Sequence, residues 1–187
     1  MEKAESSRLS QLLITALDVF ARQGYRKTSM EDIARSAGIS RQGLYLHFKN
    51  KDEVFSAAVR KSLNDGLTAT QHVLAESQLG LEEKLLRVLD EWFGRHVGLL
   101  QPDASDLAVH CERLLGDLVF QQNSVFQEIL QQTMMAASAD NKTSRDQAAT
   151  AAEMLSACAL TWKHTLTSRQ EFLNKLESSI ALCCRNL

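Results

Sequence analysis

The segment of residues 28–51 constrains the fold most strongly, because it places two short helical patterns on either side of a glycine. Thr28 and Glu31 have the T-x-x-E spacing of a capping box, which predicts that a helix begins there. Gly38 predicts its end, and Ser40 is a candidate N-cap for a second helix after a short turn. Two short helices joined by a tight turn predict a helix-turn-helix.

The second helix divides into distinct faces when each residue is rotated by about 100°. Leu44 and Phe48 share the face expected to pack on the core, and Leu46 lies opposite them. Tyr45 and His47 lie on the two edges between these faces. Such a helix suits the DNA major groove, where one face meets the base edges and the two edges meet the phosphates.

The start of this helix carries polar side chains that can contact bases. Arg41 can bind guanine and Gln42 can bind adenine with paired hydrogen bonds. Gly43 costs about 1 kcal/mol relative to alanine inside a helix, and close approach of the backbone to phosphate would explain it. Leu46 is either a contact to thymine methyl groups or an incidental exposed leucine, and both readings stay open.

Charge is divided unevenly along the chain. Residues 1–61 hold 11 Lys and Arg against 7 Asp and Glu, which leaves 10 against 16 in the remainder. A polyanion such as DNA should therefore be attracted to the part that holds the helix-turn-helix.

Composition favours an all-helical protein outside membranes. The chain has 187 residues, of which 44% are hydrophobic, with one proline and eight glycines. No apolar run is long enough to cross a bilayer and the start lacks an apolar signal segment, so we expect a cytoplasmic protein. The four cysteines lack the spacing of a disulfide framework, and reduced thiols are expected.

About nine helices are expected in total. Hydrophobic periodicity and breaker residues place them at residues 7–23, 28–38, 40–48, 50–75, 81–99, 107–115, 119–138, 144–167 and 169–184.

The last two helices each present a face of small and apolar side chains. This face is either intramolecular core or half of a four-helix dimer seam. A short recognition helix reads few base pairs, so the DNA hypothesis favours the dimer. The residues assigned to the seam are Ala152, Leu155, Ala159, Phe172, Leu176 and Ile180.

Aromatic and methionine side chains on the central helices could line a mostly apolar ligand pocket, although such stripes are more often plain core. Few charges lie on these faces, which favours a lipophilic or aromatic small molecule. The candidates are Trp92, Phe93, His96, His110, Phe120, Phe126, Met134 and Trp162.

Four motifs lie in the first third of the chain: A-L-D-V-F-A-R-Q-G-Y at residues 16–25, T-S-M-E-D-I-A at 28–34, A-G-I-S-R-Q-G-L-Y-L-H-F at 37–48 and K-D-E-V-F at 51–55. With these motifs, this part of the chain resembles the DNA-binding domain of the tetracycline-repressor (TetR) family.

The resemblance implies roles for individual residues. Phosphate contacts are implied for Thr28, Tyr45, His47 and Lys51. Contacts to bases and backbone are implied for Ser40, Arg41, Gln42 and Gly43. It also implies a homodimer formed by the last two helices and a small-molecule effector that releases an operator.

These observations predict an all-α protein with a helix-turn-helix domain at residues 1–50 and a helical ligand-binding and dimerisation domain at 51–187. The expected function is that of a ligand-responsive transcriptional regulator, most simply a repressor bound to a palindromic operator in double-stranded DNA. An enzyme or a protein-interaction module built on the C-terminal helices is the alternative. No nucleophile elbow, phosphate loop or metal-binding motif is evident in the sequence, so no cofactor, metal or catalytic residue is expected.

Overall fold

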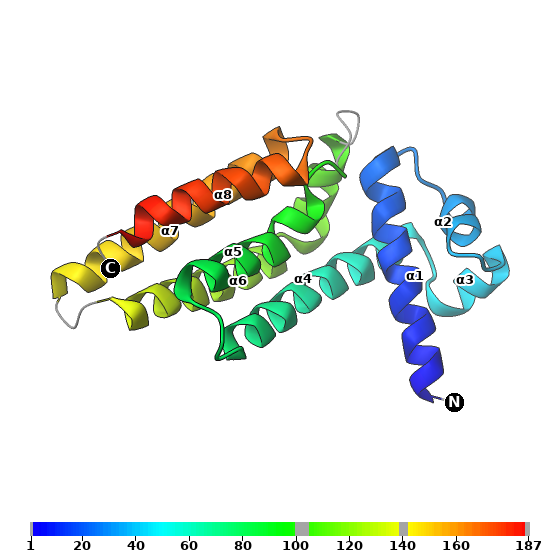
Figure 1. Cartoon of the computed structure of the whole chain (residues 1–187). Coiled ribbons are helices and arrows are strands. Elements are labelled where there is room, and N and C mark those ends of the chain that lie inside the picture. The colour runs from blue at the N-terminus through cyan, green and yellow to red at the C-terminus, as the bar shows by residue number, and fades with distance from the viewer. Residues whose placement is uncertain (1, 100–104, 139–141, 186–187) are drawn as a thin grey trace. The chain divides into compact units, whose positions relative to one another are not determined.

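The computed structural model describes residues 2–99, 105–138 and 142–185, and in these ranges the regular structure is entirely helical (Figure 1). Eight α-helices and one 3-10 helix are present there, which confirms the all-α prediction. The chain forms two compact units, one of Met1–Asp65 with Leu99–Val119 and the other of Gly66–Gly98 with Phe120–Leu187. The boundary predicted at residue 50 stays a prediction.

The first unit is built on three N-terminal helices, α1 (Glu2–Gln23), α2 (Met30–Ser36) and α3 (Arg41–His47). It also contains the first part of α4 (Lys51–Ala75) and the first part of α6 (Ser105–Ala137). The apolar faces of α1 to α4 meet in one cluster, as their periodicity predicts. Its buried side chains include Phe20, Tyr25, Ile33, Leu44 and Phe55.

The helix α2 begins one residue later than the T-x-x-E pattern predicts. Ser29 is the N-cap: its hydroxyl accepts from the Asp32 backbone N–H at 3.1 Å, and the Asp32 carboxylate accepts from the Ser29 N–H at 3.0 Å. Hydrogen bonds from Ser29 lower the pKa of Asp32. Residues 29–32 can form a capping box as residues 28–31 can, so capping alone does not set where α2 begins. The start at Met30 is the one that buries Met30 and Ile33 on the apolar face of the helix.

The helix α6 is continuous over 33 residues, so the prediction of two helices separated by Gly116 and Asp117 was wrong. An isolated glycine costs about 1 kcal/mol in a helix, which packing on both sides can outweigh. Leu115 is buried immediately before Gly116, and Phe126 and Leu130 are buried further along the same helix.

The second unit packs α5 (Leu81–Trp92) and α7 (Lys142–Thr165) against α8 (Arg169–Cys184), with the short 3-10 helix η1 (Gly94–His96) beside them. Figure 1 shows α7 and α8 lying side by side. The helix predicted over residues 81–99 is shorter in the structure, where α5 ends at Trp92. Gly98 adopts a φ of 76° in the turn that follows η1.

The residues assigned to a dimer seam lie in the core of this unit, and a seam formed by them stays a prediction. Each of them is at most 1% exposed in the single chain: Ala152, Leu155, Ala159, Phe172, Leu176 and Ile180. Helical spacing of small and apolar residues marks a face that is buried, but it does not distinguish an intramolecular neighbour from a second copy. Burial within the single chain favours the intramolecular reading of this face.

None of the helices in the described ranges is both long enough and apolar enough to cross a membrane.

Candidate nucleic-acid interface

The helix α3 is anchored by one face and presents the others to solvent. Leu44 is fully buried, whereas Leu46, two residues further on, is 82% exposed. Arg41, Gln42, Tyr45 and His47 are also exposed. The division of faces expected from the sequence is therefore present, and the side chains proposed to touch DNA lie on the accessible part of a seven-residue helix.

The turn before α3 fixes where this helix begins. Gly38 has a φ of 67°, in the left-handed region that glycine adopts easily. Ser40 is the N-cap, and its hydroxyl accepts from the Gly43 N–H at 2.9 Å. A Cβ added at Gly43 would lie 3.2 Å from the same hydroxyl oxygen. Because glycine has no side chain, the Ser40 hydroxyl can approach the helix this closely.

Arg41 makes contacts that leave it available to a ligand. Its guanidinium carbon lies 5.7 Å from the centre of the Tyr45 ring, and its nearest nitrogen lies 3.6 Å from the Glu31 carboxylate. Hydrogen bonding to Tyr45 raises the pKa of Arg41. Exposed ion pairs contribute about 0–1 kcal/mol, so phosphate or guanine can compete for this guanidinium.

Thr28 is held inside the first unit. It is 1% exposed, and its hydroxyl donates to the Gly24 carbonyl at 2.7 Å. In this geometry the phosphate contact assigned to Thr28 is not accessible, and Ser29 is the exposed hydroxyl residue beside it.

Lys51 also points toward the protein. Its Nζ donates to the carbonyls of Tyr25 and Thr28, both at 2.8 Å, and lies 4.4 Å from the centre of the Tyr25 ring. Burial lowers the pKa of Lys51, and the charge of Asp106 opposes that shift. The structure therefore shows Lys51 tying α4 to the turn between α1 and α2.

The same turn is held from the other side by α6, a contact that the sequence did not indicate. The Asp106 carboxylate accepts from the backbone N–H of Tyr25 at 3.0 Å and of Arg26 at 2.7 Å. The His110 ring stacks on Tyr25 with centres 3.9 Å apart, and Arg113 pairs with Asp52 at 3.3 Å. Asp106 and His110 of α6 thus hold the turn after α1, and Arg113 pairs with the start of α4.

Three of the candidate ligand residues come together in the second unit. Trp92 and Phe126 stack with ring centres 4.7 Å apart, and Phe93 meets Phe126 edge-on at 5.7 Å. Phe93 and Phe126 also line an open groove between α6 and α7, together with Phe120, which is 74% exposed.

The remaining candidates are dispersed. His110 belongs to the first unit, and Met134 is fully buried. Burial, with smaller effects of Lys163 and Arg95, lowers the pKa of His96 to about 3, so this imidazole is neutral at pH 7. Trp162 lies under the ammonium of Lys175 at 5.9 Å.

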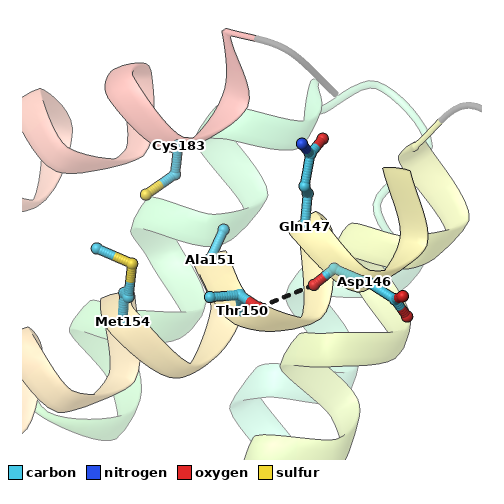
Figure 2. A pocket seen from close by; sticks show the side chains of 6 residues that line it. All are labelled: Asp146, Gln147, Thr150, Ala151, Met154 and Cys183. Carbon is cyan, nitrogen blue, oxygen red and sulfur yellow. Dashed lines mark hydrogen bonds between the residues drawn. The ribbon is translucent and has the colours of Figure 1, made fainter. Parts of the chain in front are cut away.

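A second groove runs between α7 and α8. Figure 2 shows Cys183 of α8 facing Ala151 and Met154 of α7, with Gln147 and Thr150 along the same side. Its volume is about 450 Å³. Met154 is more than half exposed, as is Leu182 on α8.

Metal binding has no structural support in the described ranges, where no cluster of three or more His, Cys, Asp or Glu side chains could hold an ion. None of the four cysteines, which all lie in the described ranges, forms a disulfide.

Comparison with known proteins places the strongest similarity on the helix-turn-helix. Residues 12–58 match the sequence profile of the bacterial regulatory proteins of the tetR family. The chain is 38% identical over 74 residues to the probable acrEF/envCD operon repressor of Escherichia coli K12, which is 36% of this chain and 34% of that protein. It is 36% identical over 67 residues to the transcriptional activator FasR of Mycolicibacterium smegmatis, covering 36% and 31%.

These matches span about a third of the length of the curated relatives. Similarity in fold extends further. A transcriptional regulator from Rhodococcus sp. Rha1 superposes with a TM-score of 0.69 at 19% identity, covering 95% of this chain and 94% of that one.

Proposed function

We propose that this chain, whose residues 12–58 match the tetR family of bacterial regulatory proteins, is a DNA-binding transcriptional regulator. The observation that carries the proposal is the exposed surface of α3, where Arg41, Gln42 and Tyr45 stand clear of the core while Leu44 fixes the helix. A helix presented in this way can lie in the major groove.

Repression is the mode that we propose, with double-stranded operator DNA as the partner. The relatives named above include both a repressor and an activator, so the mode needs its own test. A reporter gene placed behind the selected operator should lose expression when the chain is present. A rise in reporter expression would show that the chain acts as an activator and not as a repressor.

Different residues serve different parts of DNA recognition in this proposal. Arg41 and Gln42 read base edges, and Leu46 contacts thymine methyl groups. Tyr45 and His47 hold phosphates on the groove walls, which adds affinity but no sequence choice. Thr28 and Lys51 act by positioning the turn before α2, because their polar groups are already bound within the unit.

Arg41→Ala and Tyr45→Ala should separate sequence choice from affinity. Loss of a bidentate base contact is expected to weaken binding to the preferred site by about 1–3 kcal/mol and to relax selection at one base pair. Tyr45→Ala should weaken binding to all sequences by similar factors. Selection from a random DNA pool, followed by titration at several salt concentrations, measures both effects.

Arg60→Ala is the matched control, because it removes an exposed arginine from α4 that is not assigned to DNA. If selection with the unmodified chain yields no two-fold symmetric site, or if Arg41→Ala selects the same site with the same preference, the assignment of α3 is wrong.

We also propose a homodimer that uses the outward faces of α7 and α8 rather than their buried faces. Met154 and Leu182 are large, exposed apolar side chains of α7 and α8, and Met154 lines the groove shown in Figure 2. Exposed apolar groups that cluster often mark an interface. Two copies would present two α3 helices to the half-sites of a palindrome.

The double substitution Met154→Lys and Leu182→Lys should convert the dimer to a monomer, because it buries two unpaired charges in the proposed interface. Sedimentation velocity at micromolar concentration measures the change. Thr68→Lys, at an exposed position of α4 that lies outside the proposed interface, is the control that should leave the dimer intact. A monomeric unmodified chain, or a double variant that still dimerises, contradicts the surface proposed here.

A small-molecule effector completes the proposed mechanism, and a lipophilic or aromatic compound fits the aromatic lining of the second unit. A regulator of bacterial transcription acts on the chromosome, so we place the protein in the cytoplasm.

A further inference from the structure

The groove between α6 and α7 in the second unit combines an aromatic wall with negative charge. Its volume is about 490 Å³, within the range of pockets that hold drug-sized molecules. Residues of α6 and α7 form most of its lining, and Phe93, which follows α5, contributes to it.

The aromatic wall is only partly explained by packing within the chain. Phe93 and Phe126 are buried and meet edge to face, so they form a rigid base. Phe120 is different, because it is 74% exposed although it lies on the same wall. Leu160 adds a half-exposed apolar side chain from α7. The wall can therefore cover an apolar ring without rearranging the core.

The charges at this groove have one sign. Glu128 of α6 and Glu153 of α7 line it, and none of the described lining residues is Lys, Arg or His. Glu153 accepts a hydrogen bond from Gln131 at 3.1 Å, which holds its carboxylate in place. A cation would be attracted here and an anion repelled.

One polar atom at the groove has no hydrogen-bond partner among the residues that the structure describes. It is the side-chain amide nitrogen of Gln127, a lining residue, and it is buried. A buried amide without a partner carries a desolvation cost of about 1–3 kcal/mol. A bound molecule with a polar group could form a hydrogen bond with the side-chain amide of Gln127. Rotation of this amide can present either its nitrogen or its oxygen to the bound molecule.

We infer that this groove binds small hydrophobic organic cations, with the cationic centre between Glu128 and Glu153 and the apolar rings against Phe120 and Phe126. Aromatic faces attract cations in addition to covering apolar surface, so charge and lining favour the same ligand class. The identification of this ligand as the effector rests on the proposed function, whereas binding itself does not.

Two probes of the same shape and opposite charge test the charge preference. Isothermal titration of the full chain, without DNA, should show tetraphenylphosphonium binding at least tenfold more tightly than tetraphenylborate. Glu128→Gln and Glu153→Gln together should remove most of this preference. Phe120→Ala should weaken both probes several-fold, because it removes part of the apolar wall.

Glu177→Gln is the matched control, since it neutralises an exposed carboxylate on α8 that does not line the groove. Equal binding of the two probes, or a loss of preference in Glu177→Gln equal to that in the double variant, overturns the inference. Circular dichroism confirms that each variant is folded before the titrations are compared.

A second copy of the chain is the other possible occupant of this groove. Sedimentation velocity of Phe120→Ala decides between them: an unchanged oligomeric state supports the ligand site, and dissociation overturns it. DNA binding is measured separately by retention of the selected operator. Absence of cation preference with intact DNA binding overturns this inference alone, whereas cation preference without DNA binding overturns only the proposed function.

Discussion

Leu44→Ala is expected to lower the free energy of unfolding of the first unit by about 2–5 kcal/mol, the range for truncating a fully buried leucine. Leu44 has no exposed surface and is the buried residue of α3. A helix of seven residues has little stability of its own, so its position depends on this anchor. DNA binding should weaken as the fraction of molecules with α3 packed on the core decreases.

Leu46→Ala is the matched control for this experiment, because it makes the same chemical change two residues away on the opposite face. Leu46 is 82% exposed, so its truncation should change stability by less than about 0.5 kcal/mol. Its effect should appear in DNA affinity, at sites that contain thymine. Urea denaturation and DNA titration of both variants give the comparison.

Equal destabilisation by the two substitutions would show that α3 is not oriented as described. Unchanged DNA affinity in Leu46→Ala would identify Leu46 as an incidental exposed leucine, one of the two readings that the sequence leaves open.

The faces of α3 could be predicted because they depend on residues close together in the chain. Helical rotation alone separates Leu44 from Leu46 and places Ser40 before the first turn, and the structure confirms these positions. The start of α2 was predicted one residue too early, since Thr28 and Ser29 carry the same capping group. Burial of Met30 decides the register, and burial depends on the packed neighbours.

The role of the apolar faces of α7 and α8 could not be predicted in the same way. Leu155 and Leu176 have the spacing of buried residues, and they are buried. Which surface covers them depends on tertiary packing, and here it is the core of a single chain. The same limit applies to Gly116, where the packing of α6 outweighs the local preference for a break.

The contact between Asp106 and the turn after α1 left no pattern in the sequence. Asp106 lies 81 positions after Tyr25 and 80 positions after Arg26 in the sequence. Neither Tyr25 nor Arg26 belongs to a motif that requires a carboxylate partner. The structure shows that α6 holds this turn in the first unit and continues through Val119 into the residues of the second. One helix therefore takes part in both units.

Asp106→Asn is expected to destabilise the first unit by about 1.5–3 kcal/mol, the range for hydrogen bonds to a charged group. The carboxylate accepts from two backbone N–H groups at 3.0 Å and 2.7 Å, whereas an amide offers one oxygen and turns a donor toward the other N–H. The amide protons of Tyr25 and Arg26 should then exchange faster with solvent, and urea should unfold the unit at lower concentration.

Asp117→Asn is the matched control, because it makes the same change at an exposed position of the same helix. It should leave both stability and exchange at residues 25 and 26 unchanged. If the two variants behave alike, Asp106 is not the anchor of the turn. If only Asp106→Asn loosens the turn, weaker DNA binding in that variant would show that α6 controls how firmly the helix-turn-helix is held.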